Sequence, residues 1–193
     1  ITAGGDKLTY TGETATPTAG VETIKCHWNS TISDPDAQYC TMDIANMYLE
    51  SLLPKPEYVR FLKALIPAAF YKKYKLDEIA DGQYVYAEMQ RAWYGLKQAG
   101  KIAHDDLVAH LAKYGYRKTR LTEGLFKHDT RNITFTLVVD DFGIKYTDKA
   151  DVDHLYNCLS EKYKIKVDWT GNRYVGIDLE WDYKERAVYC SMN

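Results

Sequence analysis

The chain has 193 residues, of which 46% are hydrophobic and 27% are charged, with a formal net charge of −2. This length predicts one domain, or one domain with an inserted sub-domain, and the apolar fraction predicts a buried core. No apolar run approaches the roughly 20 residues that span a bilayer, and residues 1–20 lack a signal-peptide pattern. The four cysteines lie far apart without metal-binding spacing, which predicts reduced thiols in an intracellular protein that does not contact a membrane.

Charged residues are unevenly distributed along the chain. Residues 1–54 contain two Lys or Arg and seven Asp or Glu, residues 55–131 contain fifteen and nine, and residues 132–193 contain eight and eleven. The net charges are therefore −5, +6 and −3. A basic middle between acidic ends suits a phosphate-binding surface beside metal-binding carboxylates, but ordinary surface charge gives the same counts.

The first half of the chain alternates between irregular and periodic segments. Residues 1–38 are rich in Gly, Thr and Pro and predict loop with short strands. An apolar strand is predicted at about Tyr39–Ile44, followed by a stretch with three prolines and a basic run. A short strand is predicted at Gln83–Glu88. Apolar residues at helical spacing then predict a helix over about Leu96–Tyr114.

The second half predicts a compact series of strands and one helix. Strands are predicted at Gly124–Lys127, Ile133–Val139 and Phe142–Tyr146, a helix at Lys149–Tyr163, a strand near Ile165–Trp169, and a closing hairpin of Tyr174–Trp181 with Ala187–Met192. Because the third strand follows the second at once, Asp140 and Asp141 must lie at a tight hairpin tip.

This order predicts an α+β fold with a ferredoxin-like β-α-β-β-α-β antiparallel sheet and both helices on one face. In that topology the first strand and the central hairpin are neighbours, so Asp43 should lie beside Asp140 and Asp141. Three crowded carboxylates repel one another unless divalent cations neutralise them, and carboxylate oxygens suit Mg²⁺. Asp is also a common turn residue, so the pair alone does not establish a metal site.

Four segments in one order resemble the successive motifs of reverse transcriptases. They are Thr41–Leu49, Ala92–Ala99, Leu137–Asp141 and Tyr174–Leu179. The run Tyr-Gly-Leu-Lys-Gln-Ala at residues 94–99 resembles the copia-type LTR retrotransposon family in particular. The resemblance covers about residues 39–181. It implies a polymerase palm and an RNA-directed DNA polymerase, a nucleotidyltransferase that adds deoxynucleotides to the 3′-hydroxyl of a primer.

The resemblance implies which side chains bind the metal ions and the incoming nucleotide. Asp43 and Asp140 would bind two Mg²⁺ ions, or Mn²⁺ in their place, with Asp141 as the third carboxylate. The implied nucleotide-binding residues are Ile44, Tyr48, Gln98 and Lys166. Tyr48 would exclude a 2′-hydroxyl by the bulk of its ring, although a core tyrosine is the simpler alternative.

Two further roles follow from the resemblance. Lys166 lies where the family has a lysine that can protonate the leaving pyrophosphate, but Lys162 and Lys164 are close enough in sequence to compete for that role. Tyr174, Val175 and Gly176 match the primer grip, a hairpin that positions the primer 3′ end. An ordinary amphipathic strand is the alternative for the last segment.

The resemblance also implies domains and partners. Residues 1–38 would be partial fingers, 39–51 the first catalytic strand of the palm, 52–90 a fingers excursion and 91–193 palm with a primer-grip-like hairpin. The implied partners are an RNA or DNA template, a DNA primer and deoxynucleoside triphosphates (dNTPs), with thumb and RNase H regions of a longer polyprotein. Without a thumb, this segment alone is expected to have low activity. The implied location is a cytoplasmic retrotransposon particle, and the oligomeric state is left open.

One departure from the family supports an alternative. The family usually has an aromatic residue two positions before the first hairpin aspartate, where this chain has Val138. A non-catalytic nucleic-acid-binding remnant of a retrotransposon polyprotein would tolerate that change. A third interpretation is another palm-type nucleotidyl transferase, such as an RNA-templated RNA polymerase, which would accept a 2′-hydroxyl; Tyr48 argues against it.

Overall fold

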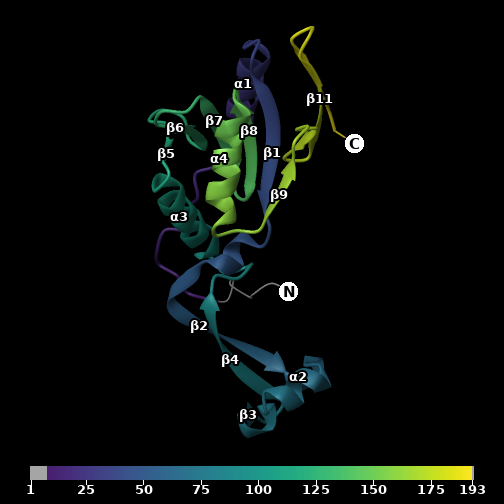
Figure 1. Cartoon of the computed structure of the whole chain (residues 1–193). Helices are drawn as coiled ribbons and strands as arrows, with labels where there is room; N and C mark the ends of the chain where they lie inside the picture. Colours follow the sequence, from purple (N-terminus) through teal and green to yellow (C-terminus); the bar gives the residue numbers. More distant parts are fainter. Residues whose placement is uncertain (1–7, 193) are drawn as a thin grey trace. The chain divides into compact units, whose positions relative to one another are not determined.

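The computed structural model describes residues 8–192, which fold as two compact units (Figure 1). Residues 8–14 and 48–102 form the first unit, and residues 15–47 and 103–192 form the second. Residues 1–7 of the predicted partial-fingers segment lie outside the described residues. Each unit has a buried apolar cluster of its own. All three predicted catalytic aspartates belong to the second unit.

The second unit is built on a six-stranded antiparallel sheet with the order β5-β6-β7-β8-β1-β9. Its strands are β1 (Gln38–Ile44), β5 (Tyr116–Lys118), β6 (Leu125–His128), β7 (Ile133–Val138), β8 (Asp141–Tyr146) and β9 (Ile165–Asp168). β1 pairs with β8 on one side and with β9 on the other. The predicted mixed α+β fold with an antiparallel sheet is confirmed, and the first strand is the neighbour of the central hairpin.

Helices cover both faces of this sheet. The side chain of Thr134 on β7 contacts His27 of α1 (Val21–Ile32) at 2.9 Å. The ring of the next residue, Phe135, contacts Tyr116, whose hydroxyl contacts His154 of α4 (Lys149–Ser160). Successive residues of a strand point to opposite faces, so α1 and α4 lie on opposite sides. In the last turn of α3 (Ala99–Ala112), Nε2 of His110 lies 2.7 Å from the carbonyl oxygen of Cys158 in α4. The two predicted helices therefore contact each other.

The prediction that residues 1–38 are loop with short strands is wrong for residues 21–32, because α1 is a 12-residue helix. Its buried residues are Ile24, His27, Trp28 and Thr31, which repeat every three or four positions as one helical face does. Two of these four are polar, so hydrophobicity alone hides the period. Packing of this face against the sheet, rather than helix propensity, stabilises α1.

A three-stranded sheet with the order β10-β11-β12 completes the second unit. Its strands are β10 (Arg173–Tyr174), β11 (Ile177–Asp182) and β12 (Ala187–Ser191), close to the predicted closing hairpin. Tyr174 and Leu179 of this sheet join Trp28 and Tyr39 in one buried cluster. The Trp28 indole donates a hydrogen bond of 3.0 Å to the Tyr39 hydroxyl. This cluster fixes β10 and β11 beneath the face of the main sheet that α1 also covers.

The first unit contains a second antiparallel sheet with the order β2-β4-β3. Its strands are β2 (Leu52–Leu62), β3 (Ala80–Asp81) and β4 (Tyr84–Arg91). β4 was predicted, but β2 was not, because Pro54 and Pro56 lack the N–H groups that a strand ladder uses. The pairing of β2 with β4 shifts register between Leu52 and Glu57, and both prolines fall inside this irregular stretch.

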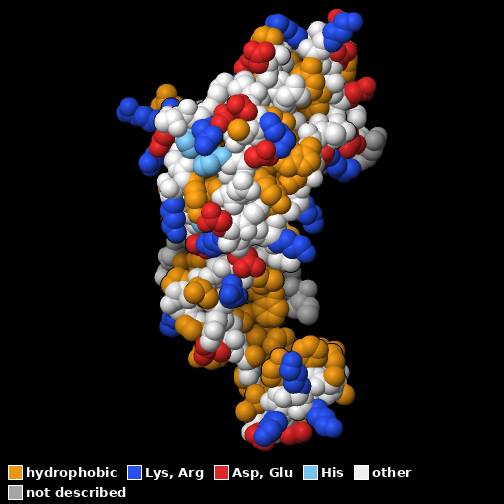
Figure 2. Space-filling view, viewed as in Figure 1, with side chains coloured by type: hydrophobic (Ala, Val, Ile, Leu, Met, Phe, Trp, Pro, Cys, Tyr) orange, Lys and Arg blue, Asp and Glu red, His pale blue; other side chains and the backbone are white. Residues whose placement is uncertain are grey.

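Three short helices connect β2 to β3 and have no buried residue among them. They are η3 (Lys63–Leu65), α2 (Ala68–Lys73) and η4 (Leu76–Glu78). Figure 2 shows hydrophobic side chains gathered on the surface here, and Leu65 is 76% exposed. No helix among residues 8–192 is both long enough and apolar enough to cross a membrane. The four cysteines are free; Cys40 and Cys158 are buried, and Cys26 and Cys190 are exposed.

Candidate active site

Strand pairing brings the predicted aspartates together. Asp43 on β1 and Asp141 on β8 are directly opposite each other in the antiparallel ladder, so their side chains leave the same face of the sheet. Asp140 lies at the tip of the β7–β8 hairpin. Its carbonyl oxygen accepts a hydrogen bond of 3.1 Å from the backbone N–H of Ile44, at the end of β1. Residues far apart in the sequence are thus neighbours at one end of the sheet.

A pocket of about 330 Å³ opens at this end of the sheet and is formed entirely by the second unit. β1, β8, β9 and the β10–β11 turn contribute its walls. Among its lining residues are Asp43, Asp141, Lys166, Tyr174, Val175 and Gly176. The pocket therefore combines two of the predicted metal ligands, the predicted lysine and the whole predicted primer-grip segment.

Both turns beside the pocket contain a valine in the left-handed backbone region. Val139, in the β7–β8 turn, has φ +57°, and Val175, in the β10–β11 turn, has φ +45°. A positive φ is unfavourable for a β-branched residue, because its side chain crowds the neighbouring carbonyl group. Such strain persists only where the surrounding structure enforces it, and it is concentrated at functional sites.

Burial and neighbouring negative charge raise the pKa of both hairpin carboxyl groups. Burial raises the pKa of Asp141 to about 6, and the negative charges of Asp140 and Asp43 add to this. Burial also raises the pKa of Asp140, its own backbone N–H opposes the shift, and Asp43 adds to it. Lys166 supplies a positive charge, with its Nζ 3.5 Å from Oδ2 of Asp43. Burial and neighbouring negative charge thus both disfavour the charged forms of Asp140 and Asp141.

The donor chemistry of this pocket fits Mg²⁺. Among residues 8–192, no three His, Cys, Asp or Glu side chains are gathered closely enough to enclose a metal ion. Mg²⁺ needs only one or two protein carboxylates, because water and substrate phosphates supply its other ligands. Asp43 and Asp141 offer such oxygens from paired strands. Burial, with the negative charges of Asp140 and Asp43, raises the pKa of Asp141, and a cation would compensate those charges. The residues present therefore fit the implied ion.

Strand register separates the three candidate lysines. Lys166 is the β9 partner of Asp43 and lines the pocket. Lys162 instead forms an ion pair with Asp106, and the carbonyl oxygen of Lys164 accepts a hydrogen bond from the chain just after β1. Of the three, Lys166 is the one that the fold places beside the aspartates.

The carboxylate of Asp168 is also at the pocket, but backbone N–H groups already donate hydrogen bonds to it. Asp168 lines the pocket, and its side chain accepts hydrogen bonds from the N–H groups of Thr170 and Asn172 at 2.9 and 2.8 Å. Such bonds hold a turn in place. Asp168 therefore shapes the β9–β10 connection, unlike the aspartates of the hairpin.

A family model described as reverse transcriptase (RNA-dependent DNA polymerase) matches residues 9–188 of this sequence. The chain belongs to this family. The matched range includes all four motifs and the whole pocket. The copia-type assignment, predicted from the run at residues 94–99, is confirmed.

Two solved telomerase structures are also similar to the chain. Telomerase from Candida albicans, in complex with a TWJ fragment of telomeric RNA, is 13% identical with a TM-score of 0.43, and the match covers 84% of this chain and 33% of that chain. Apo telomerase from Candida tropicalis, truncated from its C-terminal domain, is 14% identical with a TM-score of 0.45, and the match covers 90% and 40%. The chain spans about a third to two fifths of the length of these proteins.

The other three predicted nucleotide-binding residues of this reverse transcriptase family member do not line the pocket. Tyr48, in η2 (Met47–Glu50), and Gln98, just before α3, belong to the first unit. The ring of Tyr48 packs against that of Tyr94, with the ring centroids 4.7 Å apart. The Gln98 side chain is buried and donates a hydrogen bond of 3.0 Å to Glu57. Ile44 is fully buried in the second unit, so its side chain does not line the pocket.

Sequence reasoning missed two residues beneath the hairpin. Thr136 on β7 is fully buried, and its hydroxyl lies 3.1 Å from that of Tyr174. Gly143 on β8 lies so close to other groups that a Cβ atom there would be 2.1 Å from the Tyr39 hydroxyl. A lone glycine inside a buried strand is a sequence signal of such a close approach. Nothing in the sequence sets Thr136 apart.

Proposed function

We propose that this chain is the palm, with part of the fingers, of a reverse transcriptase that extends a DNA primer on an RNA or DNA template. The observation that carries the proposal is the pairing of Asp43 with Asp141 at one end of the sheet, beside Asp140 at the hairpin tip. Membership of the family and the pocket chemistry support the same function. The substrates would be dNTPs.

The proposed reaction is phosphoryl transfer. The 3′-oxygen of the primer forms a bond to the α-phosphorus of the nucleotide, and the bond from that phosphorus to the bridging oxygen breaks, which releases pyrophosphate. Asp43, Asp140 and Asp141 would hold two Mg²⁺ ions, which when bound supply the positive charge that stabilises the attacking and leaving oxygens. Lys166 would bind the triphosphate, and its ammonium group is a proton source for pyrophosphate.

The β10–β11 turn would orient the primer in this proposal. Val175 and Gly176 line the same pocket as Asp43 and Asp141, at the turn between two short strands. Lys166 and Arg173 add positive charge to the wall from which the turn projects, and their side chains are 73% and 67% exposed. Exposed cations of this kind bind the phosphate backbone without regard to base sequence.

Extension of a DNA primer on an RNA template, in Mg²⁺ with all four dNTPs, tests the proposal. Asp140→Asn is expected to lower the rate by about 10³-fold, because it removes a charge that acts in the transition state. Asp153→Asn is the matched control, since Asp153 is a half-exposed aspartate of α4 that pairs with Lys149. Undiminished extension by Asp140→Asn, in an assay in which wild type extends the primer, would refute the assignment of Asp140.

Sugar selection tests the role proposed for Tyr48. Tyr48→Ala is expected to raise the ratio of ribonucleotide to deoxynucleotide incorporation, because the ring no longer occupies the space of the 2′-hydroxyl. Tyr48→Phe keeps the ring and should keep the wild-type ratio. Unchanged discrimination in Tyr48→Ala would show that Tyr48 is only a packing partner of Tyr94.

A further inference from the structure

The hydroxyl group of Tyr174 lies beneath the β7–β8 hairpin and contacts both of its strands. Tyr174 is 2% exposed. Its Oη donates to the carbonyl oxygen of Thr136 at 3.0 Å and also lies 3.4 Å from the carbonyl oxygen of Asp141. The Thr136 hydroxyl donates back to the same Oη at 3.1 Å. One side chain thus contacts β7 two residues before its end and β8 at its first residue.

The underside of the hairpin has no space for movement toward β10. A Cβ atom at Gly143 would lie 2.9 Å from Cε1 of Tyr174 and 2.9 Å from Oγ1 of Thr136, in addition to its clash with Tyr39. The rings of Tyr39 and Tyr174 meet edge to face at 6.4 Å. The hairpin backbone therefore rests directly on two buried tyrosines, and glycine is the residue that permits this contact.

The hairpin tip needs such support because its turn is strained. Val139 keeps its φ of +57° only while the flanking strands are held in register. The contacts of Tyr174 lie immediately below this turn, on both strands.

We propose that Tyr174 is a positioning residue for Asp141: its hydroxyl fixes the Asp141 backbone and so sets the position of that carboxylate relative to Asp43. The inference rests on the proposed function, because it concerns the carboxylates proposed to hold Mg²⁺. The resemblance implies that Tyr174 belongs to the primer grip. Its buried ring points instead to an indirect role, in which it acts on the site through the hairpin.

Mg²⁺-dependent stabilisation tests this role without requiring catalysis. An ion that binds the folded state raises the melting temperature, so a Mg²⁺ titration of that temperature yields a half-saturating concentration. Tyr174→Phe removes only the hydroxyl and keeps the ring. We expect the half-saturating Mg²⁺ concentration to rise by about 10-fold, the typical effect of losing a group that orients a metal ligand. In primer extension, kcat at a fixed low Mg²⁺ concentration should fall similarly, with KM for dNTPs unchanged.

Two control variants separate positioning from general destabilisation. Tyr116→Phe removes a hydroxyl from another buried tyrosine, one that contacts His154 on the opposite face of the sheet. It should lower the melting temperature without moving the Mg²⁺ midpoint. Thr136→Val removes a donor to Tyr174 but leaves both carbonyl acceptors of the Tyr174 hydroxyl, so its Mg²⁺ midpoint should stay near wild type.

The outcomes distinguish this inference from the proposed function. If wild type responds to Mg²⁺ and Tyr174→Phe responds with the same midpoint, the positioning role is refuted and the proposed function is untouched. If Thr136→Val and Tyr174→Phe shift the Mg²⁺ midpoint equally, the positioning role is also refuted, since the shift would then come from local packing. If wild type and Asp43→Asn both lack any Mg²⁺ response, the proposed metal-binding function itself fails.

Discussion

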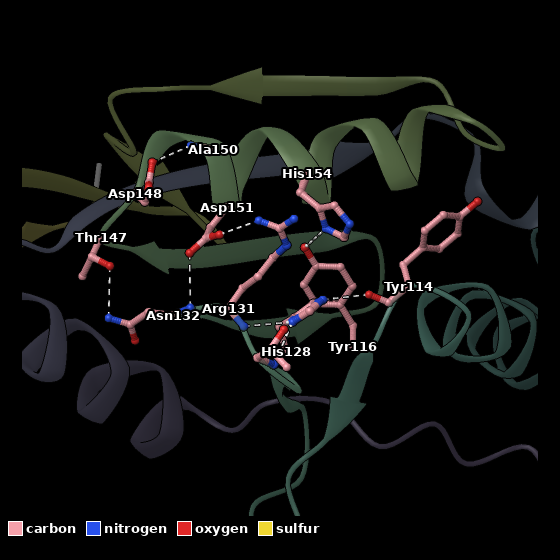
Figure 3. A network of polar contacts seen from close by, with 11 residues as sticks. Tyr114, Tyr116, His128, Arg131, Asn132, Thr147, Asp148, Ala150, Asp151 and His154 are labelled. Atoms are coloured by element: carbon pink, nitrogen blue, oxygen red, sulfur yellow. Dashed lines mark hydrogen bonds and ion pairs between the residues drawn. The ribbon is translucent and has the colours of Figure 1, made fainter.

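Two polar clusters in the second unit differ in one respect: whether the hydrogen-bond donors and acceptors within the cluster are paired with one another. In the first, shown in Figure 3, Asp151 of α4 accepts hydrogen bonds from the Arg131 side chain at 2.8 Å and from the Asn132 backbone at 3.2 Å. His128 accepts two backbone N–H groups of the β6–β7 turn on one ring nitrogen, and its other nitrogen contacts the Tyr114 carbonyl oxygen at 2.8 Å. This cluster, here called the α4 network, fixes a turn to a helix.

The second cluster, around the β7–β8 tip, has the opposite character. Burial raises the pKa of Asp140 and of Asp141, the negative charge of Asp43 adds to both shifts, and the turn between the strands contains the strained Val139. The cation that pairs with Asp43 is the ammonium group of Lys166, whose side chain is 73% exposed. Exposed ion pairs of this kind contribute little stability.

The difference separates structural from functional polar groups. A cluster whose donors and acceptors match stabilises the fold and needs no ligand. A cluster of like charges in a pocket is destabilising until a ligand of opposite charge compensates it, and perturbed pKa values of this kind are typical of functional sites. The α4 network therefore needs no ligand, whereas the hairpin tip has the charge pattern on which the proposed metal site depends.

The sharpest contrast is expected between Asp141→Asn and Asp151→Asn. Asp141→Asn should lower primer extension by about 10²–10³-fold, yet raise the melting temperature in the absence of metal, because it removes a repelling charge. Asp151→Asn should leave the extension rate of the folded protein unchanged. Extension assays and thermal unfolding of both variants check this. A loss of stability in Asp141→Asn would contradict the contrast.

Stability should be lost specifically in the α4 network. Asp151→Asn is expected to cost about 1–3 kcal/mol of unfolding free energy, because it leaves Arg131 and a backbone N–H without their acceptor. Asp153→Asn, on the same helix, breaks only an exposed pair with Lys149 and should cost less than about 0.5 kcal/mol. Denaturant unfolding measures both values. Equal costs would show that the network adds nothing beyond a surface ion pair.

The two clusters should respond to pH with opposite signs. The folded-state pKa of Asp141 is raised to about 6, so its contribution to stability is present at low pH and is lost as the pH rises through about 6. Burial, with the charges of Arg131 and His128, lowers the pKa of His154, so its contribution is present above pH 6.5 and is lost as the pH falls. Urea unfolding from pH 5 to 8 should show that Asp141→Asn removes the first trend and His154→Gln the second. Parallel pH profiles for wild type and both variants would contradict these assignments.

The smallest effect is expected from the strained turn. Val139→Gly should stabilise the protein by at most about 1 kcal/mol, because glycine accepts a positive φ and the opposing loss of chain entropy on folding offsets part of the gain. Extension should fall modestly, because a looser turn holds Asp140 less firmly. Val175→Gly is the matched variant in the β10–β11 turn. Destabilisation by more than about 1 kcal/mol in both variants would show that the valine side chains contribute more through packing than they cost in strain.

The arrangement of strands around the aspartates could be predicted because its signals are local. The apolar run of Tyr39–Ile44 and the immediate return of the chain after Asp140 define a strand and a hairpin, and the order of elements makes them neighbours. The roles of the individual site residues stay predictions. Lys166 could not be chosen over Lys162 from sequence, because the choice depends on the register of β9 against β1.

Other features could not be predicted because tertiary contacts decide them. The inward face of α1 includes His27, whose Nε2 contacts the Thr134 hydroxyl, and Thr31, whose hydroxyl donates to the helix backbone. The β2 strand forms despite Pro54, because an irregular register leaves the prolines out of the ladder. The contact of Tyr174 with the Asp141 carbonyl joins residues from separate sheets, and no spacing in the sequence indicates it.

The central claim is that Asp43 and Asp141 share a bound cation, and a double-mutant cycle on the Mn²⁺ dissociation constant tests it most directly. Paramagnetic resonance of free Mn²⁺ would give this constant for wild type, Asp43→Asn, Asp141→Asn and the double variant. If both carboxylates bind one ion, each single substitution should weaken binding strongly and the double variant should lose much less than the sum of the two free-energy changes. Wild-type affinity in either single variant would contradict the account.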